Sequence, residues 1–358
     1  MFRKIGIILV GVVFVMTFIS CTSAPVKDYA ISQQFREGKF HNLKPMPVND
    51  SGTMMRILWR YITEKRQEPV PVSPVPVHAL TTQQLHQENN GLDALYRLGH
   101  SSLLLNLNKT FWLIDPVFGD RASPFNWIGP ARFHKAPLTP DQLPEITGVI
   151  ISHDHYDHLD QFTVQHLKDK VKHFIVPLGV GQHLMKWGVN EQKITELDWW
   201  QQTLINGVSV TATPSQHFSG RGLSDGNSTL WASWVIRSEQ SSLFYSGDSG
   251  YFDGFQEIGQ KFGPFDLTIM ENGAYDKMWA NVHMHPEETL QAHQDVQGKN
   301  LLPVHNSTFD LAFHDWHEPL NRLQILSEQA SVTMVTPEIG QRMNISESAQ
   351  YQSRWWNR

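Results

Sequence analysis

Cysteine is almost absent from this sequence: Cys21 is the only one among 358 residues. A single cysteine excludes an internal disulfide, even in a compartment where disulfides form. It also excludes a zinc site built from several thiolates, so any zinc ion must be bound by histidine and carboxylate side chains. Histidine is plentiful, with 18 in the chain.

Excess positive charge is absent as well. The formal net charge is -6 at pH 7 and no basic stripe is apparent, so we expect no nucleic-acid partner. No repeat of fixed period is present, which argues against a solenoid or a propeller. Hydrophobic residues make up 40% of the chain, enough for a sizeable core in one large domain or two modest ones.

A long apolar run is present only near the N-terminus. It extends from Ile5 to Ile19 behind Arg3 and Lys4, and it is shorter than the roughly 20 residues that a membrane span needs. The run ends in Phe18-Ile19-Ser20-Cys21, which resembles a bacterial lipobox, and Thr22 favours sorting to the outer membrane. We predict a lipoprotein signal peptide over residues 1–20, lipidation of Cys21, and a membrane-anchored outer-membrane lipoprotein in the bacterial cell envelope. An uncleaved signal anchor is the alternative, and it exports the chain too.

The rest of the chain changes character near residue 93. Residues 21–92 form a polar, irregular N-terminal extension, with an amphipathic helix expected over Thr53–Lys65 and a Pro-rich strap over residues 68–77. Residues 93–345 alternate short β-rich runs with helices, and residues 346–358 form a C-terminal tail. The expected strands are Ser102–Asn106, Phe111–Ile114, Gly148–Ser152, His173–Val176, Val208–Thr213, Ala232–Arg237, Leu243–Ser246, Leu267–Met270, Asn300–Val304 and Val332–Val335. The expected helices are Gln161–Lys168, Val180–Trp187, Pro286–Val296 and Glu318–Glu328. This order favours an α/β sandwich with helices outside two sheets.

A cluster of metal-ligand side chains follows one apolar strand directly. The segment His153-Asp154-His155-Tyr156-Asp157-His158 places three imidazoles and a carboxylate at a strand-to-helix turn. Zinc prefers this mixture of nitrogen and oxygen ligands. A solvated polar loop is the bland alternative, but this spacing behind a buried strand rarely arises by chance.

Three later residues have the same context, because each follows a β-like run: His217, Asp248 and His305. Taken singly, each would more often be a structural residue. Their order along the chain, after the His153 turn, favours a shared metal site.

The complete series resembles the signature of the metallo-β-lactamase superfamily, which implies an αββα sandwich. Longer strings between about residues 40 and 330 resemble the branch of N-acyl-phosphatidylethanolamine-hydrolysing phospholipases D. These strings are Asp115-Pro116-Val117-Phe118, Arg121-Ala122-Ser123-Pro124, Gly129-Pro130-Ala131-Arg132-Phe133, Gln216-His217-Phe218-Ser219-Gly220-Arg221, Leu230-Trp231-Ala232-Ser233-Trp234, Gly247-Asp248-Ser249-Gly250-Tyr251 and Gly273-Ala274-Tyr275.

The resemblance implies a binuclear zinc site. One Zn²⁺ would be held by His153, His155 and His217, the other by Asp157, His158 and His305, and Asp248 would bridge both. Two such ions lower the pKa of a shared water, so a hydroxide that bridges the metals is the expected nucleophile. We therefore expect a phospholipase D-type phosphodiesterase that converts a phospholipid such as N-acyl-phosphatidylethanolamine to phosphatidic acid and an alcohol.

Further roles follow from the same resemblance. Asp115 would orient the His153 turn, although a turn-forming aspartate before Pro116 is an equal alternative. The predicted catalytic residues are Asp157, Asp248, His283 and Tyr275. Of these, His283 and Tyr275 would contact a phosphate or amide oxygen of the substrate. A packed or surface side chain is the alternative for both His283 and Tyr275.

Two segments depart from the family pattern. Asn306-Ser307 stand where Trp-Gly is expected after the last ligand, and Glu271-Asn272 stand where the phospholipases carry apolar residues. Neither segment includes an expected ligand, so the departures bear on substrate choice. A hydrolase of a soluble substrate, such as a lactone or phosphoester, and a non-catalytic zinc lipoprotein are the alternative functions. The only protein assembly that we predict is a homodimer.

Overall fold

The computed structural model describes residues 29–45 and 51–357, apart from the side chains of residues 51–54 and 58. The predicted signal peptide and the predicted lipidation site Cys21 lie outside the described residues. None of the helices in these described residues combines the length and the hydrophobicity that a membrane-spanning helix requires.

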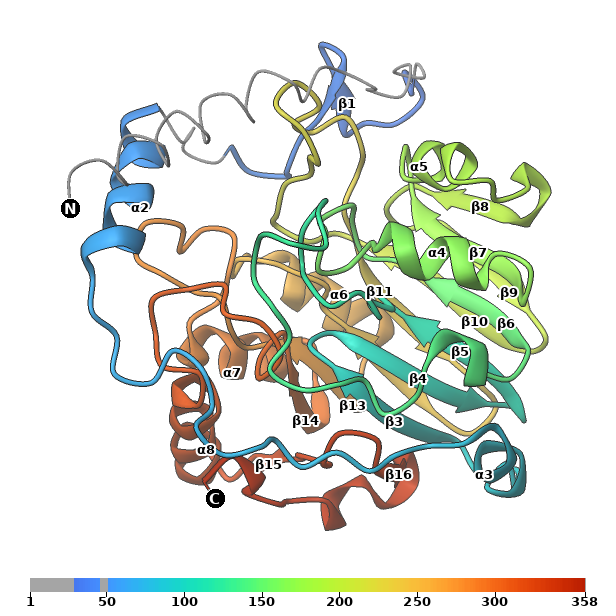
Figure 1. The fold of residues 1–358 in the computed structure, drawn as a ribbon. Helices are drawn as coiled ribbons and strands as arrows, with labels where there is room; N and C mark the ends of the chain where they lie inside the picture. Colours follow the sequence, from blue (N-terminus) through green and yellow to red (C-terminus); the bar gives the residue numbers. More distant parts are fainter. Residues whose placement is uncertain (1–28, 46–50, 358) are drawn as a thin grey trace.

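Two sheets of seven strands form the centre of the molecule (Figure 1). The first has the order β16-β3-β4-β5-β6-β7-β8, and its strands are β3 (Ala94–Gly99), β4 (Ser102–Leu107), β5 (Thr110–Ile114), β6 (Ile146–Ile150), β7 (Val171–Pro177), β8 (Ile194–Leu197) and β16 (Arg342–Asn344). The second has the order β15-β14-β13-β12-β11-β10-β9, and its strands are β9 (Gln202–Ile205), β10 (Val208–Thr213), β11 (Ser233–Arg237), β12 (Ser242–Tyr245), β13 (Phe265–Glu271), β14 (Gly298–Val304) and β15 (Thr333–Met334).

Helices cover the outer face of each sheet. They are α3 (Thr82–Gln87), α4 (Gln161–Leu167) and α5 (Gly181–Lys186) against the first sheet, and α6 (Gly254–Phe262), α7 (Pro286–Asp295) and α8 (Glu318–Gln329) against the second. The helix α2 (Ser51–Thr63) and the hairpin β1 (Phe35–Arg36) and β2 (Lys39–Phe40) precede the sandwich. Short 3-10 helices span Pro140–Gln142, Glu191–Lys193, Ile345–Gln350 and Trp355–Asn357.

Three apolar clusters correspond to the spaces between these layers. Side chains such as Trp112 and Ile150 from one sheet meet Trp234 and Tyr245 from the other in the central cluster. The two remaining clusters lie between each sheet and its helices. The layers are therefore helix, sheet, sheet, helix, which confirms the predicted αββα sandwich.

Every predicted strand and helix is present, with ends shifted by a few residues. The sequence did not predict β1, β2, β3, β8, β9, β16, α3 or α6. Arg97 interrupts the apolar run of β3 and is nevertheless fully buried, which hid that strand from a pattern of apolar residues. Gly254 and Gly259 lower the helix propensity of α6.

The N-terminal extension is less irregular than we predicted. Tyr29 and Phe40, on either side of the hairpin turn, are buried in the central cluster. In the Pro-rich strap, Val72 is exposed as expected for a spacer, whereas Val75 packs in the cluster beneath α6, α7 and α8. At the other end of the chain, Trp355 is buried in that same cluster.

Candidate metal centre

The histidine-rich turn is fixed at both ends by regular structure. Strand β6 ends two residues before Ser152. The Ser152 amide donates a hydrogen bond to the buried carboxylate of Asp115. At the other end, the Asp160 side chain caps α4 by accepting hydrogen bonds from the amides of Phe162 and Thr163. Cap residues of this kind satisfy amides that lack a partner in the first helical turn. The turn between these points presents His153, His155, Asp157 and His158.

The structure brings the distant members of the predicted set to this turn. His217 follows β10, Asp248 follows β12 and His305 follows β14, all strands of the second sheet. The Asp248 carboxylate Oδ2 lies 3.7 Å from His153 Nε2 and 3.0 Å from His305 Nε2. Ligands from both sheets therefore meet at one edge of the sandwich.

One group contains His153, His155, His217 and Asp248. His155 Nδ1 lies 2.8 Å from His153 Nε2 and 3.2 Å from His217 Nε2. Asp248 Oδ2 is 3.8 Å from His217 Nε2. All four side chains offer a potential ligand atom, and these atoms lie within 4.8 Å of one another.

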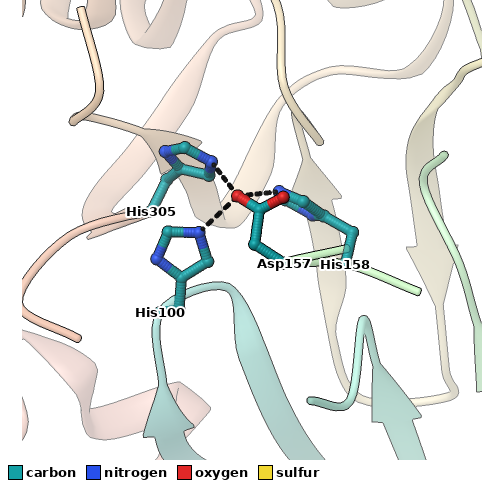
Figure 2. Close-up of side chains that lie close together, drawn as sticks. All are labelled: His100, Asp157, His158 and His305. Atoms are coloured by element: carbon teal, nitrogen blue, oxygen red, sulfur yellow. Dashed lines mark hydrogen bonds and ion pairs between the residues drawn. The ribbon is translucent and has the colours of Figure 1, made fainter. Parts of the chain in front are cut away.

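A second group contains Asp157, His158, His305 and also His100, as Figure 2 shows. Asp157 Oδ2 lies 3.0 Å from His100 Nε2, 3.2 Å from His305 Nε2 and 3.6 Å from His158 Nε2. The structure therefore places a histidine beside this group that the sequence analysis did not single out.

Asp248 lies between the two groups. Its Oδ2 faces the His153, His217 and His305 rings, and its Oδ1 lies 3.1 Å from His158 Nε2. Burial opposes ionisation of this carboxyl, but His158 and His305 outweigh burial and hold the Asp248 pKa well below its usual range. The residue is thus an anion in the position that a ligand of two cations needs.

The side chains fit zinc in kind and in spacing. For Zn–N distances of about 2.0–2.1 Å, neighbouring donors of a tetrahedral site lie roughly 3.3 Å apart. The separations given above bracket that value. His158 Nε2 and Asp248 Oδ1 are buried and make no hydrogen bond with any described residue, although they face each other. Buried polar atoms without a partner are costly, and a cation between them would remove that cost.

A buried carboxylate orients the histidine turn. Asp115 accepts hydrogen bonds from the Ser152 amide at 2.7 Å, from the Tyr245 hydroxyl at 2.5 Å and from His158 Nδ1 at 2.7 Å. Because His158 donates through Nδ1, its Nε2 is left to face the metal position. The predicted orienting role of Asp115 is confirmed in this geometry.

His283 lies beside the candidate centre and is held by an acidic partner. Its Nδ1 is 2.7 Å from Glu271 Oε2, and its ring centroid is 5.2 Å from that of His217 and 5.1 Å from that of His305. Glu271 is fully buried, and its other oxygen accepts the Met284 amide. Glu271 was noted in the sequence only as a departure from the family pattern, and its pairing with His283 was not foreseen.

Tyr275 lies elsewhere. Its hydroxyl donates to Glu318 Oε2 at 2.6 Å, and its ring packs on His285 and His314. None of these partners belongs to the predicted metal set. The structure therefore does not join Tyr275 to the cluster through these contacts.

His100 was missed because the strand before it was missed. It directly follows β3, and its φ of 52° lies in the left-handed region, outside the extended conformation of the strand. Its ring packs on the ring of His305 at 4.1 Å between centroids, and burial lowers the His100 pKa to about 3. A neutral His100 can donate a hydrogen bond to Asp157 or serve as a ligand. The signal available in the sequence was its place after the apolar run that ends at Gly99.

A cavity of about 900 Å³ adjoins the histidine turn at Tyr156. Its lining combines the aromatic rings of Phe118, Phe125 and Trp187 with polar and charged groups, including Arg221. The Arg221 guanidinium lies 3.9 Å from the centroid of the Tyr156 ring. The cavity is large enough for a small organic molecule or one end of a lipid.

Comparison of the sequence with known proteins identifies a matching family and several relatives of this chain. The family model of the β-lactamase superfamily domain matches residues 110–306, more than half of the chain. A Caenorhabditis elegans protein named N-acyl-phosphatidylethanolamine-hydrolyzing phospholipase D 1 is 32% identical over 91% of this chain and 98% of its own length. The outer membrane protein RomA of Klebsiella pneumoniae is 51% identical over 27% of this chain and 74% of its own length.

Solved structures share the fold at lower sequence identity. An isothiocyanate hydrolase from Delia radicum gut bacteria has a TM-score of 0.56 and 17% identity, covering 70% of this chain and 98% of that protein. At this identity, the likeness concerns the fold alone.

Proposed function

Because the chain belongs to the metallo-β-lactamase superfamily of metal-dependent hydrolases, in its N-acyl-phosphatidylethanolamine-hydrolysing phospholipase D-like branch, we propose that it is a zinc-dependent phosphodiesterase of phospholipids. The substrate class is N-acyl-phosphatidylethanolamine or a related phospholipid. The products are phosphatidic acid and an alcohol such as an N-acylethanolamine.

The observation that carries the proposal is the meeting of the predicted ligand side chains around Asp248. When bound, two zinc ions would activate water at neutral pH and stabilise negative charge that develops at phosphorus. We assign His153, His155 and His217 to one ion, Asp157, His158 and His305 to the other, and Asp248 to both.

Residues around the ligands have separate tasks in this proposal. Asp115 fixes the His158 ring by accepting its Nδ1–H. His283, held by Glu271, contacts a phosphate oxygen through the ring nitrogen that Glu271 does not engage. The aromatic cavity beside Tyr156 receives apolar parts of the substrate and excludes water from them. Contact of Tyr275 with a phosphate or amide oxygen of the substrate stays a prediction, and its hydroxyl donates to Glu318 in this structure.

The proposal includes a location. We propose that Cys21 is lipidated and anchors the protein in the outer membrane, where its substrate resides. The similarity to an outer membrane protein of Klebsiella pneumoniae supports this location. Homodimer formation stays a prediction, and size-exclusion chromatography with light scattering tests it.

The test is turnover by the purified metal-loaded protein. We expect hydrolysis of N-acyl-phosphatidylethanolamine, with phosphatidic acid detected by mass spectrometry. Phosphatidylcholine and a panel of lactones serve as comparison substrates. Turnover of lactones alone would refute the phospholipid assignment and favour a soluble substrate. Zinc binding without turnover of any substrate would favour the structural-zinc alternative.

A further inference from the structure

A fully buried arginine belongs to strand β3, three residues before His100. Arg97 has no solvent-exposed surface, and its Nη2 donates to the Asn306 side chain at 2.6 Å. Its Nε and Nη1 are buried and find no acceptor within residues 29–45 and 51–357, the ranges that the structure describes. Only one of the three guanidinium nitrogens therefore makes a hydrogen bond to these residues.

The positive charge of Arg97 is not balanced by any side chain of the described residues. The two atoms that accept from it, Oδ1 and the carbonyl oxygen of Asn306, are both uncharged. Burial lowers the Arg97 pKa to about 10, which leaves the guanidinium protonated at neutral pH. Buried charges in proteins are typically paired, because removing an unpaired charge from water is costly. An anion bound beside Arg97 would remove that cost.

A second buried donor lies next to this guanidinium. Trp355 is 1% exposed, and its ring centroid lies 5.5 Å from Arg97 Cζ. Its Nε1 also lacks an acceptor among the residues that the structure describes. An indole N–H and a guanidinium can only donate, so neither group satisfies the other. Both side chains need an acceptor, and one small anion can serve both.

Asn306 connects Arg97 to the loop that carries a predicted zinc ligand. It follows His305 directly, and its Nδ2 donates to the Val304 carbonyl at 2.9 Å. His305 and Ser307, on either side of it, have positive φ angles of 63° and 60°, which residues other than glycine rarely adopt. Asn306 stands where the family pattern has Trp, whose side chain cannot accept a hydrogen bond from Arg97. The pairing of Arg97 with Asn306 is therefore a departure of this chain from the family pattern.

We propose that a small monovalent anion such as chloride binds at Arg97 and accepts hydrogen bonds from its unpartnered nitrogens and from Trp355 Nε1. One negative charge balances the one charge of the guanidinium. Water can accept the same hydrogen bonds, but it leaves that charge uncompensated. The burial of both side chains excludes a bulky anion such as gluconate. The anion completes the network that holds the His305 loop through Asn306, and it takes no part in hydrolysis.

Equilibrium unfolding in urea tests the site in the full-length, zinc-loaded protein. The midpoint is measured in sodium chloride and in sodium gluconate at equal ionic strength, so general charge screening is matched. Every molecule passes through the unfolded state, which lets even a buried anion exchange. An anion that binds only the folded chain stabilises it in proportion to the logarithm of its concentration once the site is nearly saturated.

The Arg97→Met variant separates the site from the general effects of the two salts. It removes the charge and keeps a long side chain, so it responds only to those general effects. We expect replacement of chloride by gluconate to lower the urea midpoint of the unmodified protein relative to that of Arg97→Met. Arg322→Met, which removes an exposed arginine paired with Glu287, should respond like the unmodified protein. An identical salt response of the unmodified protein and Arg97→Met would overturn the proposal.

A second variant tests the indole donor. Trp355→Phe keeps an aromatic ring and removes Nε1–H, so it should need on the order of tenfold more chloride for the same stabilisation. The matched control is Trp356→Phe, because Trp356 is also buried but its Nε1 donates to Asn321. Chloride dependence in Trp355→Phe equal to that of the unmodified protein would overturn the contact with Trp355.

Bromide locates the ion directly and needs no variant. Crystals of the unmodified protein grown with sodium bromide are measured at the bromine absorption edge. We expect an anomalous peak next to Arg97 Nε or Nη1. Ordered water without an anomalous signal at that position would overturn the proposal. Neither the unfolding curves nor the crystals depend on turnover, so failure of the proposed phosphodiesterase activity would leave these results to decide the anion site.

Discussion

Glu271 and His283 form a buried acid–imidazole pair, with 2.7 Å between Glu271 Oε2 and His283 Nδ1. The pair lies against Asp248 and His305, and all four side chains bring a polar atom within 4.8 Å of one another. Burial raises the Glu271 pKa, and the His283 ring opposes that effect. The carboxylate thus fixes the direction in which His283 presents its free nitrogen.

Removal of the Glu271 carboxylate should lower catalytic turnover strongly and change metal binding little. We expect Glu271→Gln to lower kcat by about tenfold to a hundredfold, because partners that orient a catalytic group typically have effects of that size. Zinc content and KM should change little. Steady-state kinetics and elemental analysis check this. The control is Glu287→Gln, on the exposed face of α7, where the carboxylate pairs with Arg322.

A double variant tests whether the two residues act together. Because Glu271 acts through His283, His283→Ala should remove the same activity, and the combined variant should be no worse than either alone. Independent, additive losses would contradict the positioning role of Glu271.

The N-terminal extension should contribute to the metal centre through Asn42. Its side chain donates to the His217 carbonyl at 2.7 Å and accepts from the His217 amide at 3.1 Å. Trp231 Nε1 also donates to it. Asn42→Ala leaves the buried amide and carbonyl of His217 without these partners, at about 1–3 kcal/mol each, whereas Trp231 Nε1 keeps its hydrogen bond to the Ser215 carbonyl. We expect zinc affinity to fall by about tenfold in competition with a chelator.

A control in the same extension isolates this effect. Gln34→Ala changes a residue just before the hairpin whose described hydrogen bonds, to Ser32 and His41, are made by its backbone, and the variant should bind zinc like the unmodified protein. Unchanged zinc affinity in Asn42→Ala would show that His217 is positioned without the extension.

Acid should destabilise the protein through His293. This residue is buried between α7 and β13, its Nδ1 lies 2.6 Å from Thr268 Oγ1, and burial lowers its pKa from 6.5 to about 4. Above pH 6.5 the ring is neutral in both the folded and the unfolded state. Between pH 6.5 and pH 4 the unfolded state binds the extra proton, so the free energy of unfolding falls as the pH decreases.

The contribution of His293 is measured as the difference in the free energy of unfolding between the unmodified protein and a His293 variant. His293→Gln should be less stable than the unmodified protein at pH 7.5, because Gln fills the site less well, and the gap should narrow by about 1–3 kcal/mol toward pH 4.5. Urea unfolding at several pH values gives this gap directly. A gap that is constant or widens on acidification would contradict a neutral buried His293.

Packing of α6 on α7 should depend on Gly259. A Cβ atom at this position would lie 2.1 Å from the Asp295 carbonyl oxygen, so Gly259→Ala should lower stability by about 1–3 kcal/mol. Gly226 has no atom within 4 Å of the corresponding position, so Gly226→Ala should have little effect. Thermal unfolding of both variants checks the contrast, and equal melting temperatures would contradict it.

The parts of the fold that sequence could predict are those with strong local patterns. Strand β6 and the turn from His153 to His158 have an apolar run followed by ligand residues at characteristic spacing. In contrast, β3 contains the buried Arg97, whose Nη2 binds the Asn306 side chain at 2.6 Å. That partner is 209 residues away, so nothing near Arg97 in the sequence indicates that it can be buried.

The same distinction applies to the candidate centre. The predicted ligands follow recognisable strands, and their order resembles a known family. The contacts of Asn42 with His217 and of Glu271 with His283 depend on how separate segments pack. His100 also follows a strand directly, but it was not predicted because that strand, β3, was not recognised in the sequence. Local pattern together with the family resemblance therefore predicted the candidate ligands, and tertiary packing decided which residues surround them.

The central claim is that two cations share Asp248, and the most direct measurement is zinc content together with turnover for Asp248→Asn. We predict about two zinc ions per chain in the unmodified protein. The variant should bind at most one and lose phospholipid turnover by more than about a hundredfold, while circular dichroism shows a retained fold. Two bound zinc ions and normal turnover in the variant would contradict the account.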